Sequence, residues 1–285
     1  MLLQQVIQGL AIGSVYGLLA LGYVLMWQAW GVMDFARGDG AMVGAFYLLI
    51  FSQFKGLNIV LAFILAVGAS ALTGFVVERI AYRPILGGRD INRLIATIGV
   101  GMFTRNLYRV MFGADPFPFP SVFGDNPIHL GKLVIVPQNL WITAIGFGLA
   151  YLLRLFLAKS WMGKAMRATA QDRETAALMG IKVKNSMTFT FVLATVIGGI
   201  AGMLIAPLYF VMADMGALMG IKGYASAVLG GLDSMSGAMV GGLILGLAEN
   251  LAGGFISSGY QTAIAFLIMI LVLIFRPQGI MGRRQ

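Results

Sequence analysis

Three polar residues lie inside stretches that are otherwise apolar: Glu249, Asn250 and Arg105. A charged side chain at the centre of a bilayer costs about 2.5–3.5 kcal/mol, so it is usually kept where it lines a polar path or meets an opposite charge. Arg109 lies one helical turn beyond Arg105 on the same helix face and could extend toward the outer surface. The sequence predicts either a polar translocation path or an interhelical ion pair, for example between Glu249 and one arginine.

A second set of polar residues lies in a stretch with the composition of a soluble protein, SWMGKAMRATAQDRETAALMGIKVKNSM at 160–187. Ser160 can cap the start of a helix, and Gly180 can end one in a left-handed conformation. We therefore predict one short amphipathic helix over about 160–180. Such a helix either lies on anionic lipid or passes a push from a soluble protein to the flanking membrane helices.

The residue types that most enzyme chemistry needs are scarce. The chain has no cysteine and one histidine, His129, so thiolate chemistry is excluded and no metal site is expected. It also has no GxxxxGK[ST] phosphate loop. We expect no catalytic residue, metal or cofactor on this chain, and any ATP and Mg²⁺ must be bound by separate subunits.

The composition indicates that membrane helices position these residues. Of the 285 residues, 59% are hydrophobic and 11% are charged, and the mean hydropathy is +0.88. Soluble domains carry about 25% charged residues. The composition therefore argues against a soluble enzyme and against a nucleic-acid-binding protein, despite a net charge of +9.

Five charge-free windows reach the length of about 20 residues that a membrane helix needs: 1–33, 56–77, 133–153, 185–213 and 250–275. Shorter apolar windows lie between them, and the second of these extends to about 112 if it tolerates its arginines: 40–54, 94–104, 223–232 and 234–248. We predict an all-α, polytopic transmembrane bundle of about eight or nine segments, some of them short or broken at glycines. It forms a single domain over 1–285.

Lysine and arginine gather in three stretches that hold fourteen of the twenty: 78–93, 154–184 and 276–284. Cytoplasmic loops collect these residues, so we place the three stretches, and the C-terminus, inside the cell. The proline-rich loop 113–139 lies outside, and its IHLGKLVIVP run predicts a short strand or hairpin. Because successive membrane helices cross in opposite directions, the short segment 218–232 must return the chain to the cytoplasmic side. The N-terminus lies outside if 40–54 crosses, and inside if that segment is re-entrant.

Glycines recur at four-residue spacing, which lets helix backbones approach closely: Gly9, Gly13 and Gly17, then Gly198 and Gly202, Gly237 and Gly241, and Gly242 and Gly246. Tight helix packing is the main interpretation, and the lining of a solute path is the other. Two hexapeptides also match, GAMVGA at 40–45 and GAMVGG at 237–242, and each follows a polar interruption. Interrupted segments of this kind can mark broken helices at a transport site.

Four blocks of sequence carry a family resemblance: GVMDFARGDGAMVGAF (31–46), ERIAYRPILGGRDINRLIATIGV (78–100), GKAMRATAQDRETAALMGI (163–181) and GYASAVLGGLDSMSGAMVGGLILGLAEN (223–250). In this order, and over nearly the whole chain, they resemble the permease subunits of bacterial ATP-binding-cassette (ABC) importers for branched-chain amino acids. The H-type subunit, the first of two paralogous permeases, is the closer likeness. Asp34 departs from the asparagine that the resemblance leads us to expect.

The resemblance implies a bacterial inner-membrane complex of this permease, a second homologous permease, two ABC ATPases and a periplasmic amino-acid-binding protein. It also implies that 163–181 is the coupling helix that docks on an ATPase, and five residues carry that match: Gly163, Arg167, Asp172, Glu174 and Gly180. The following IKVKN differs from the apolar, proline-containing end of the more general EAA loop of bacterial importers. Only the broader coupling role therefore transfers.

Two other functions remain open. Related permeases handle urea or short amides, which makes these compounds the alternative substrates. A self-sufficient, ion-coupled carrier would keep several buried acids, and the sequence offers essentially Glu249 alone. We expect an importer that works by alternating access, in which partner ATPases move the helix at 160–180 and tilt the helices that flank the path.

Overall fold

Apolar helices make up most of the computed structural model, which describes residues 2–122, 124, 128–130 and 133–282. The all-α, polytopic prediction is confirmed. Three of the charges used for the predicted orientation, Lys132, Arg283 and Arg284, lie outside the described residues.

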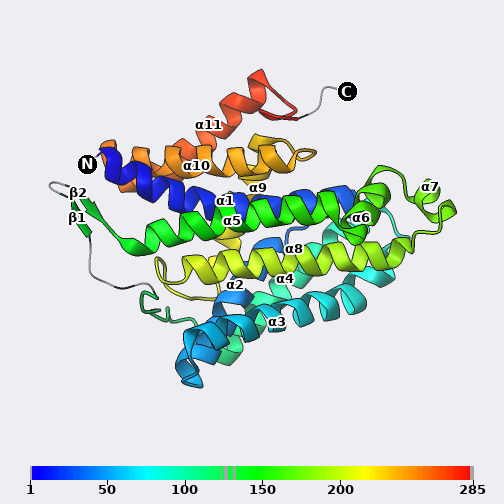
Figure 1. The fold of residues 1–285 in the computed structure, drawn as a ribbon, viewed down its shortest axis with the longest axis horizontal. Helices are drawn as coiled ribbons and strands as arrows, with labels where there is room; N and C mark the ends of the chain where they lie inside the picture. The colour runs from blue at the N-terminus through cyan, green and yellow to red at the C-terminus, as the bar shows by residue number, and fades with distance from the viewer. Residues whose placement is uncertain (1, 123, 125–127, 131–132, 283–285) are drawn as a thin grey trace.

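The helices are named in chain order as in Figure 1: α1 (Leu2–Trp30), α2 (Arg37–Leu49), α3 (Ile59–Val77), α4 (Asp90–Phe112), α5 (Pro137–Lys159), α6 (Trp161–Gln171), α7 (Arg173–Leu178), α8 (Val183–Ile205), α9 (Met215–Gly230), α10 (Met235–Phe255) and α11 (Gln261–Phe275). A π-helical turn at Ile50–Phe54 continues α2, and a second at Glu78–Tyr82 continues α3. The predicted hairpin is confirmed in the outer loop, where β1 (Ile128–Leu130) pairs antiparallel with β2 (Leu133–Ile135).

Among the residues that the structure describes, five helical stretches are long and apolar enough to span a membrane: Leu2–Trp30, Ile59–Ile85, Pro137–Lys159, Val183–Ile205 and Met235–Phe255. The charge-free window 250–275 is divided between two helices, because α10 ends at Phe255 and α11 begins at Gln261. The residues between them are rich in glycine and serine, which are weak helix formers. A window without charge is therefore not always a continuous helix.

The two ends of the bundle carry different elements. The start of α1 and the β1–β2 hairpin lie at one end, and α6 and α7 lie at the other (Figure 1). After α8 the chain reaches the outer loop, where Val211 forms a β-bridge with Phe117. α9 then returns it to the opposite end, where the amide of Ile280 donates to the carbonyl of Leu229. α9 thus runs from the loop end of the bundle to the opposite end, in the direction that the expectation for the segment around 218–232 requires.

The α2 segment runs from the middle of the bundle toward the end that carries the loop 113–139. Its first residue, Arg37, contacts Thr195 near the middle of α8. Its far end, Phe54, packs against Phe112 and Phe117 beside the outer loop. This course agrees with the crossing alternative for 40–54, and the start of the chain lies at the same end of the bundle as the loop 113–139. Which end faces the cytoplasm remains a prediction.

Glycine ridges hold α1 against α10 at the centre of the bundle. A Cβ atom on Gly13 would lie 2.9 Å from the Cα of Leu243, and one on Gly17 would lie 2.7 Å from the sulfur of Met239. These distances leave no room for a side chain, so glycine is needed for the close approach. The packing interpretation of this ridge is confirmed. By contrast, α3 and α4 expose apolar side chains such as Ile64 and Phe103, as a lipid-facing surface does.

Candidate functional site

A cluster of buried charges lies where α1 gives way to α2. Gly31, with φ of +66°, ends α1 in a conformation that favours glycine. The chain then runs through Asp34 and starts α2 at Arg37, next to the middle of α8. Helices that begin inside the membrane are typical of transport proteins. We call the six residues around this break the charged cluster: Asp34, Arg37, Asp39, Tyr82, Arg105 and Thr195.

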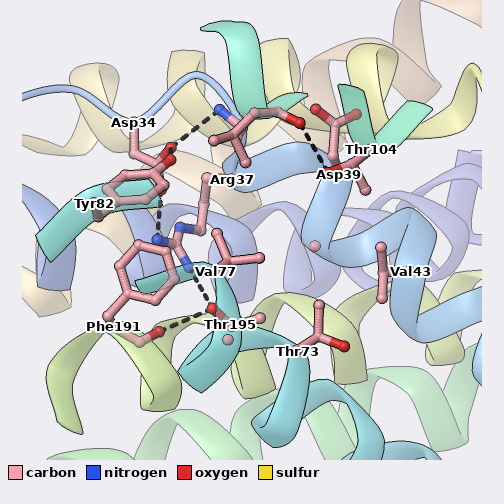
Figure 2. A pocket seen from close by; sticks show the side chains of 14 residues that line it. Asp34, Arg37, Asp39, Val43, Thr73, Val77, Tyr82, Thr104, Phe191 and Thr195 are labelled. Carbon is pink, nitrogen blue, oxygen red and sulfur yellow. Dashed lines mark hydrogen bonds and ion pairs between the residues drawn. The ribbon is translucent and has the colours of Figure 1, made fainter. Parts of the chain in front are cut away.

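Asp34 and Arg37 form the centre of the charged cluster, as Figure 2 shows. Arg37 Nη2 lies 2.5 Å from Asp34 Oδ2, and Arg37 Nη1 donates to the Thr195 hydroxyl at 3.0 Å. The Tyr82 hydroxyl donates to Asp34 Oδ1 at 2.6 Å. Both charged side chains are only 2% exposed. The pair is therefore desolvated but well hydrogen-bonded, which a buried ion pair requires.

Asp39 brings α4 into the charged cluster. Its carboxylate is 3% exposed, and Arg105 Nε lies 2.9 Å from its Oδ1. Arg105 is therefore paired with Asp39 rather than with Glu249, the partner suggested from the sequence. Arg109 lies farther out on α4 and pairs with Asp214 at 2.6 Å.

The cavity inside the charged cluster is small. It has a volume of about 40 Å³ and is lined by residues that include Asp34, Arg37, Asp39, Val43 and Phe191 (Figure 2). A water molecule needs only about 10–15 Å³ on this measure, so the cavity has room for water but not for an amino acid. In this conformation the charged cluster joins four elements, namely α2, α4, α8 and the turn after α3.

Glu249 forms a second buried pair. Its Oε1 accepts a hydrogen bond from the Lys222 ammonium of α9, and its Oε2 accepts one from the Tyr16 hydroxyl of α1 at 2.9 Å. The expected interhelical pair therefore exists, but the partner is a lysine rather than an arginine. The Asn250 amide donates to the Gly246 carbonyl of its own helix at 2.9 Å. This bond within α10 satisfies the Asn250 amide, so the buried position of this polar side chain needs no role in a translocation path.

The sequence underestimated the number of buried acids. Asp34, Asp39 and Glu78 are each no more than 3% exposed, in addition to Glu249. The sequence-based premise that Glu249 is essentially the single buried acid, which counted against a carrier, is therefore wrong. However, Asp34, Asp39 and Glu249 are each already paired with a cation. A carboxylate held by a cation is poorly suited to exchange protons during transport.

The soluble stretch after α5 is two helices rather than the single one predicted. The Ser160 hydroxyl caps α6 by accepting from the Gly163 amide at 2.9 Å, as expected. At Asp172 the backbone turns extended and α7 begins, because the Asp172 carboxylate caps the amides of Glu174 and Thr175. These bonds, and first of all one from the Thr175 hydroxyl, hold the pKa of Asp172 below its usual range.

The predicted coupling residues are spread over this helix pair. A Cβ on Gly163 would lie 2.5 Å from the Cα of Leu157, so this glycine lets α6 fold back closely on α5. Gly180 ends the element at φ of +83°, as predicted. Arg167 donates weakly to the Ala158 carbonyl at 3.4 Å, and Glu174 is exposed. We call Trp161–Leu178 the α6–α7 element.

An arginine that sequence reasoning missed ties the α6–α7 element to the core. Arg173, the first residue of α7, donates from Nη2 to the Ala29 carbonyl at 2.8 Å. Arg93 of α4 donates to the neighbouring Trp30 carbonyl at 3.1 Å. Both cations therefore sit at the C-terminal, partially negative end of α1. Trp30 in turn packs edge-on against Tyr82, whose hydroxyl binds Asp34.

Known proteins match the chain over almost its whole length. The family described as "Branched-chain amino acid transport system / permease component" matches residues 5–273. The branched-chain amino acid permease protein BraD of Pseudomonas aeruginosa is 36% identical over 99% of this chain and 96% of its own length. The corresponding LivH protein of Escherichia coli is 33% identical with the same coverage. The chain belongs to this permease family.

Membership of the permease family confirms the resemblance that the four sequence blocks carry. The block at 31–46 contains the helix break and two of the acids of the charged cluster, Asp34 and Asp39. The block at 78–100 contributes Tyr82 and Arg93, and the block at 223–250 contains Glu249. Three of the four blocks that carry the resemblance thus contribute residues to the buried polar contacts. The signal for the missed residues was present, since MDFARGD places three charges in an otherwise apolar region.

Proposed function

We propose that this permease is one of two homologous permease subunits of an ABC importer for branched-chain amino acids, with two ATPases and a periplasmic binding protein as partners. The observation that carries the proposal is the α6–α7 element. It stands at one end of the bundle and is hydrogen-bonded through Arg173 to the end of α1. The chain has no phosphate loop, so in this importer ATP is hydrolysed by separate subunits. Those subunits need an element of the permease on which they can act, and the α6–α7 element supplies it.

The path of the motion follows from these contacts. A displacement of α7 acts on the C-terminal carbonyls of α1 through Arg173. α1 is the most buried of the spanning helices, with 94% of its apolar window inside the bundle, and it is closely packed against α10. The end of α1 also leads directly into the charged cluster. A movement of the α6–α7 element is therefore passed to α1, α10 and the start of α2 together, which is what alternating access requires.

The proposed orientation puts the α6–α7 element and the C-terminal tail in the cytoplasm of a bacterial cell, with the N-terminus and the loop 113–139 outside the inner membrane. The distribution of lysine and arginine supports it. The opposite placement of the loop and the α6–α7 element at the two ends of the bundle agrees with it. The outer loop is then available to the binding protein.

Uptake by the reconstituted complex tests this function. The permease is co-expressed with the second permease and the two ATPases, purified, and placed in liposomes with the binding protein outside and ATP inside. We expect uptake of leucine, isoleucine and valine that requires both ATP and the binding protein. Uptake of urea or acetamide instead would assign the alternative substrates. Accumulation of leucine by the permease alone, without nucleotide, would show an ion-coupled carrier.

A further inference from the structure

A large cleft opens at the same end of the bundle as the α6–α7 element. It has a volume of about 860 Å³ and lies among α1, α5, α6 and the start of α10. Sites for small molecules typically have about 300–1,000 Å³, whereas the cavity of the charged cluster has about 40 Å³. We call this space the inner cleft.

The lining of the inner cleft has both charges and an apolar wall. Arg154 and Arg167 supply cations, and Asp233 supplies a carboxylate. Leu21 and Phe147 belong to the apolar part. Methionines complete it, and such flexible, polarisable side chains adapt to apolar groups of different shape: Met235, Met239 and Met281. An apolar amino acid is a zwitterion with an aliphatic side chain, and this lining complements each of its three parts.

The inner cleft reaches the middle of the membrane, because Phe147 lies halfway along α5. The outer surface of α4 at a similar depth presents apolar side chains such as Phe103 and Met102 to lipid. Gln28 and Arg154 lie nearer the ends of α1 and α5, where they line the opening of the inner cleft. Charged groups at such an opening suit a water-filled space, and the second permease can close the open side between α5 and α10.

The α6–α7 element forms part of the wall of the inner cleft. Arg167 and Gln171 of α6 line it, opposite Ser234 and Ser236 at the start of α10. Any displacement of α6 therefore changes the width of the cleft directly. This contact joins the predicted coupling residue Arg167 to a space large enough for a substrate.

We infer that the inner cleft is the cytoplasmic mouth of the translocation path and takes an apolar amino acid in its zwitterionic form, with the second permease closing its open side. The inference rests on the proposed function. It places Arg154 as a residue that receives the substrate carboxylate, and the side of α6 as a wall that moves with the ATPases.

The absence of native cysteine allows a direct test by single-cysteine labelling. Phe147→Cys lies in the inner cleft, and Phe103→Cys on α4 is a matched control because both phenylalanines are exposed and near the middle of a spanning helix. Each variant is assembled into the full complex in inside-out vesicles and treated with a membrane-impermeant thiol reagent. We expect Phe147→Cys to react, leucine to slow that reaction, and Phe103→Cys to remain unmodified. Adding Arg154→Gln should weaken protection by leucine about tenfold or more, since a charge-assisted contact is lost.

The outcomes separate this inference from the proposed function, because uptake by the wild-type complex is measured in parallel. If the wild-type complex takes up leucine but Phe147→Cys reacts no faster than Phe103→Cys, the inner cleft is not the path. Protection by urea and not by leucine would overturn the ligand class. The cleft would instead be a lipid site if two results came together. Phe147→Cys would not react, and acidic phospholipid would copurify with wild type but not with Arg154→Gln. If the wild-type complex transports no apolar amino acid, the proposed function fails and the inference fails with it.

Discussion

Neutralising Glu249 is expected to destabilise the permease through the lysine that it leaves behind. In the folded chain Lys222 is 12% exposed and Glu249 is 7% exposed, so little water can reach either charge. Removing one partner of a buried ion pair typically costs about 3–5 kcal/mol. Glu249→Gln keeps an oxygen that can accept from Tyr16, so the expected loss comes from the unpaired ammonium. Lys222→Met should cost a similar amount, because it leaves the carboxylate without its cation.

The double variant distinguishes the stabilisation by the ion pair from the cost of leaving one of its two charges unpaired. Lys222→Met with Glu249→Gln contains no buried charge at this site and retains an acceptor for the Tyr16 hydroxyl. We expect it to lie within about 2 kcal/mol of wild type, since only one amide donor is left unsatisfied. It should therefore be more stable than either single variant. Asp214→Asn is the matched control, because Asp214 is 59% exposed and its partner Arg109 is 44% exposed. Their ion pair should contribute no more than about 1 kcal/mol to the free energy of unfolding.

Reversible denaturant unfolding in detergent micelles gives the four free energies that this cycle needs. If the two single losses simply add in the double variant, Lys222 and Glu249 do not stabilise each other and the reasoning is refuted. Uptake per folded complex then decides between the two roles predicted for Glu249. A double variant that folds and transports normally identifies a structural pair, whereas one that folds and does not transport places Glu249 on the path.

Three further predictions concern the glycine ridge and the α6–α7 element. Gly13→Leu should prevent α1 from packing on α10 and abolish folded permease in fluorescence-detected size exclusion, whereas Gly68→Leu, where no atom lies within 4 Å, should be tolerated. Arg173→Gln should leave ATP hydrolysis by the complex intact while reducing uptake, whereas exposed Lys164→Gln should leave both unchanged. The pKa of Asp172 is below its usual range, so the hydrogen bonds that its carboxylate accepts stabilise the start of α7 at pH values above the ordinary aspartate pKa of about 3.9. This stabilisation is lost as the pH falls from that value through the lowered pKa. Exchange of the Glu174 amide should lose its protection in acid, and Asp172→Asn should remove that pH dependence.

The parts of the fold that the sequence predicts well are those set by local chemistry. Ser160 and Gly180 were placed at the two ends of the soluble stretch because capping and left-handed turns depend on the residue itself. The glycine ridge of α1 was identified for the same reason, since only a small residue allows a close backbone approach. Asp172 shows the limit of such reasoning. Its side chain can cap a new helix as well as continue an old one, and the structure shows that it caps α7.

The partners of Glu249 and Arg105 could not be predicted, because each of these two pairs joins residues distant in the sequence. Glu249 and Arg105 were both recognised as unusual, yet each is paired with a residue that was not singled out, Lys222 and Asp39. In a membrane a charge selects whichever opposite charge the helix packing brings near. That packing depends on where α2 begins, and the break at Gly31–Ala36 moves its start to mid-depth. Once that break is known, the pair of Asp39 with Arg105 follows, since Asp39 then faces α4. The polar interruption before α2 is therefore the most informative signal in the sequence for the charged cluster.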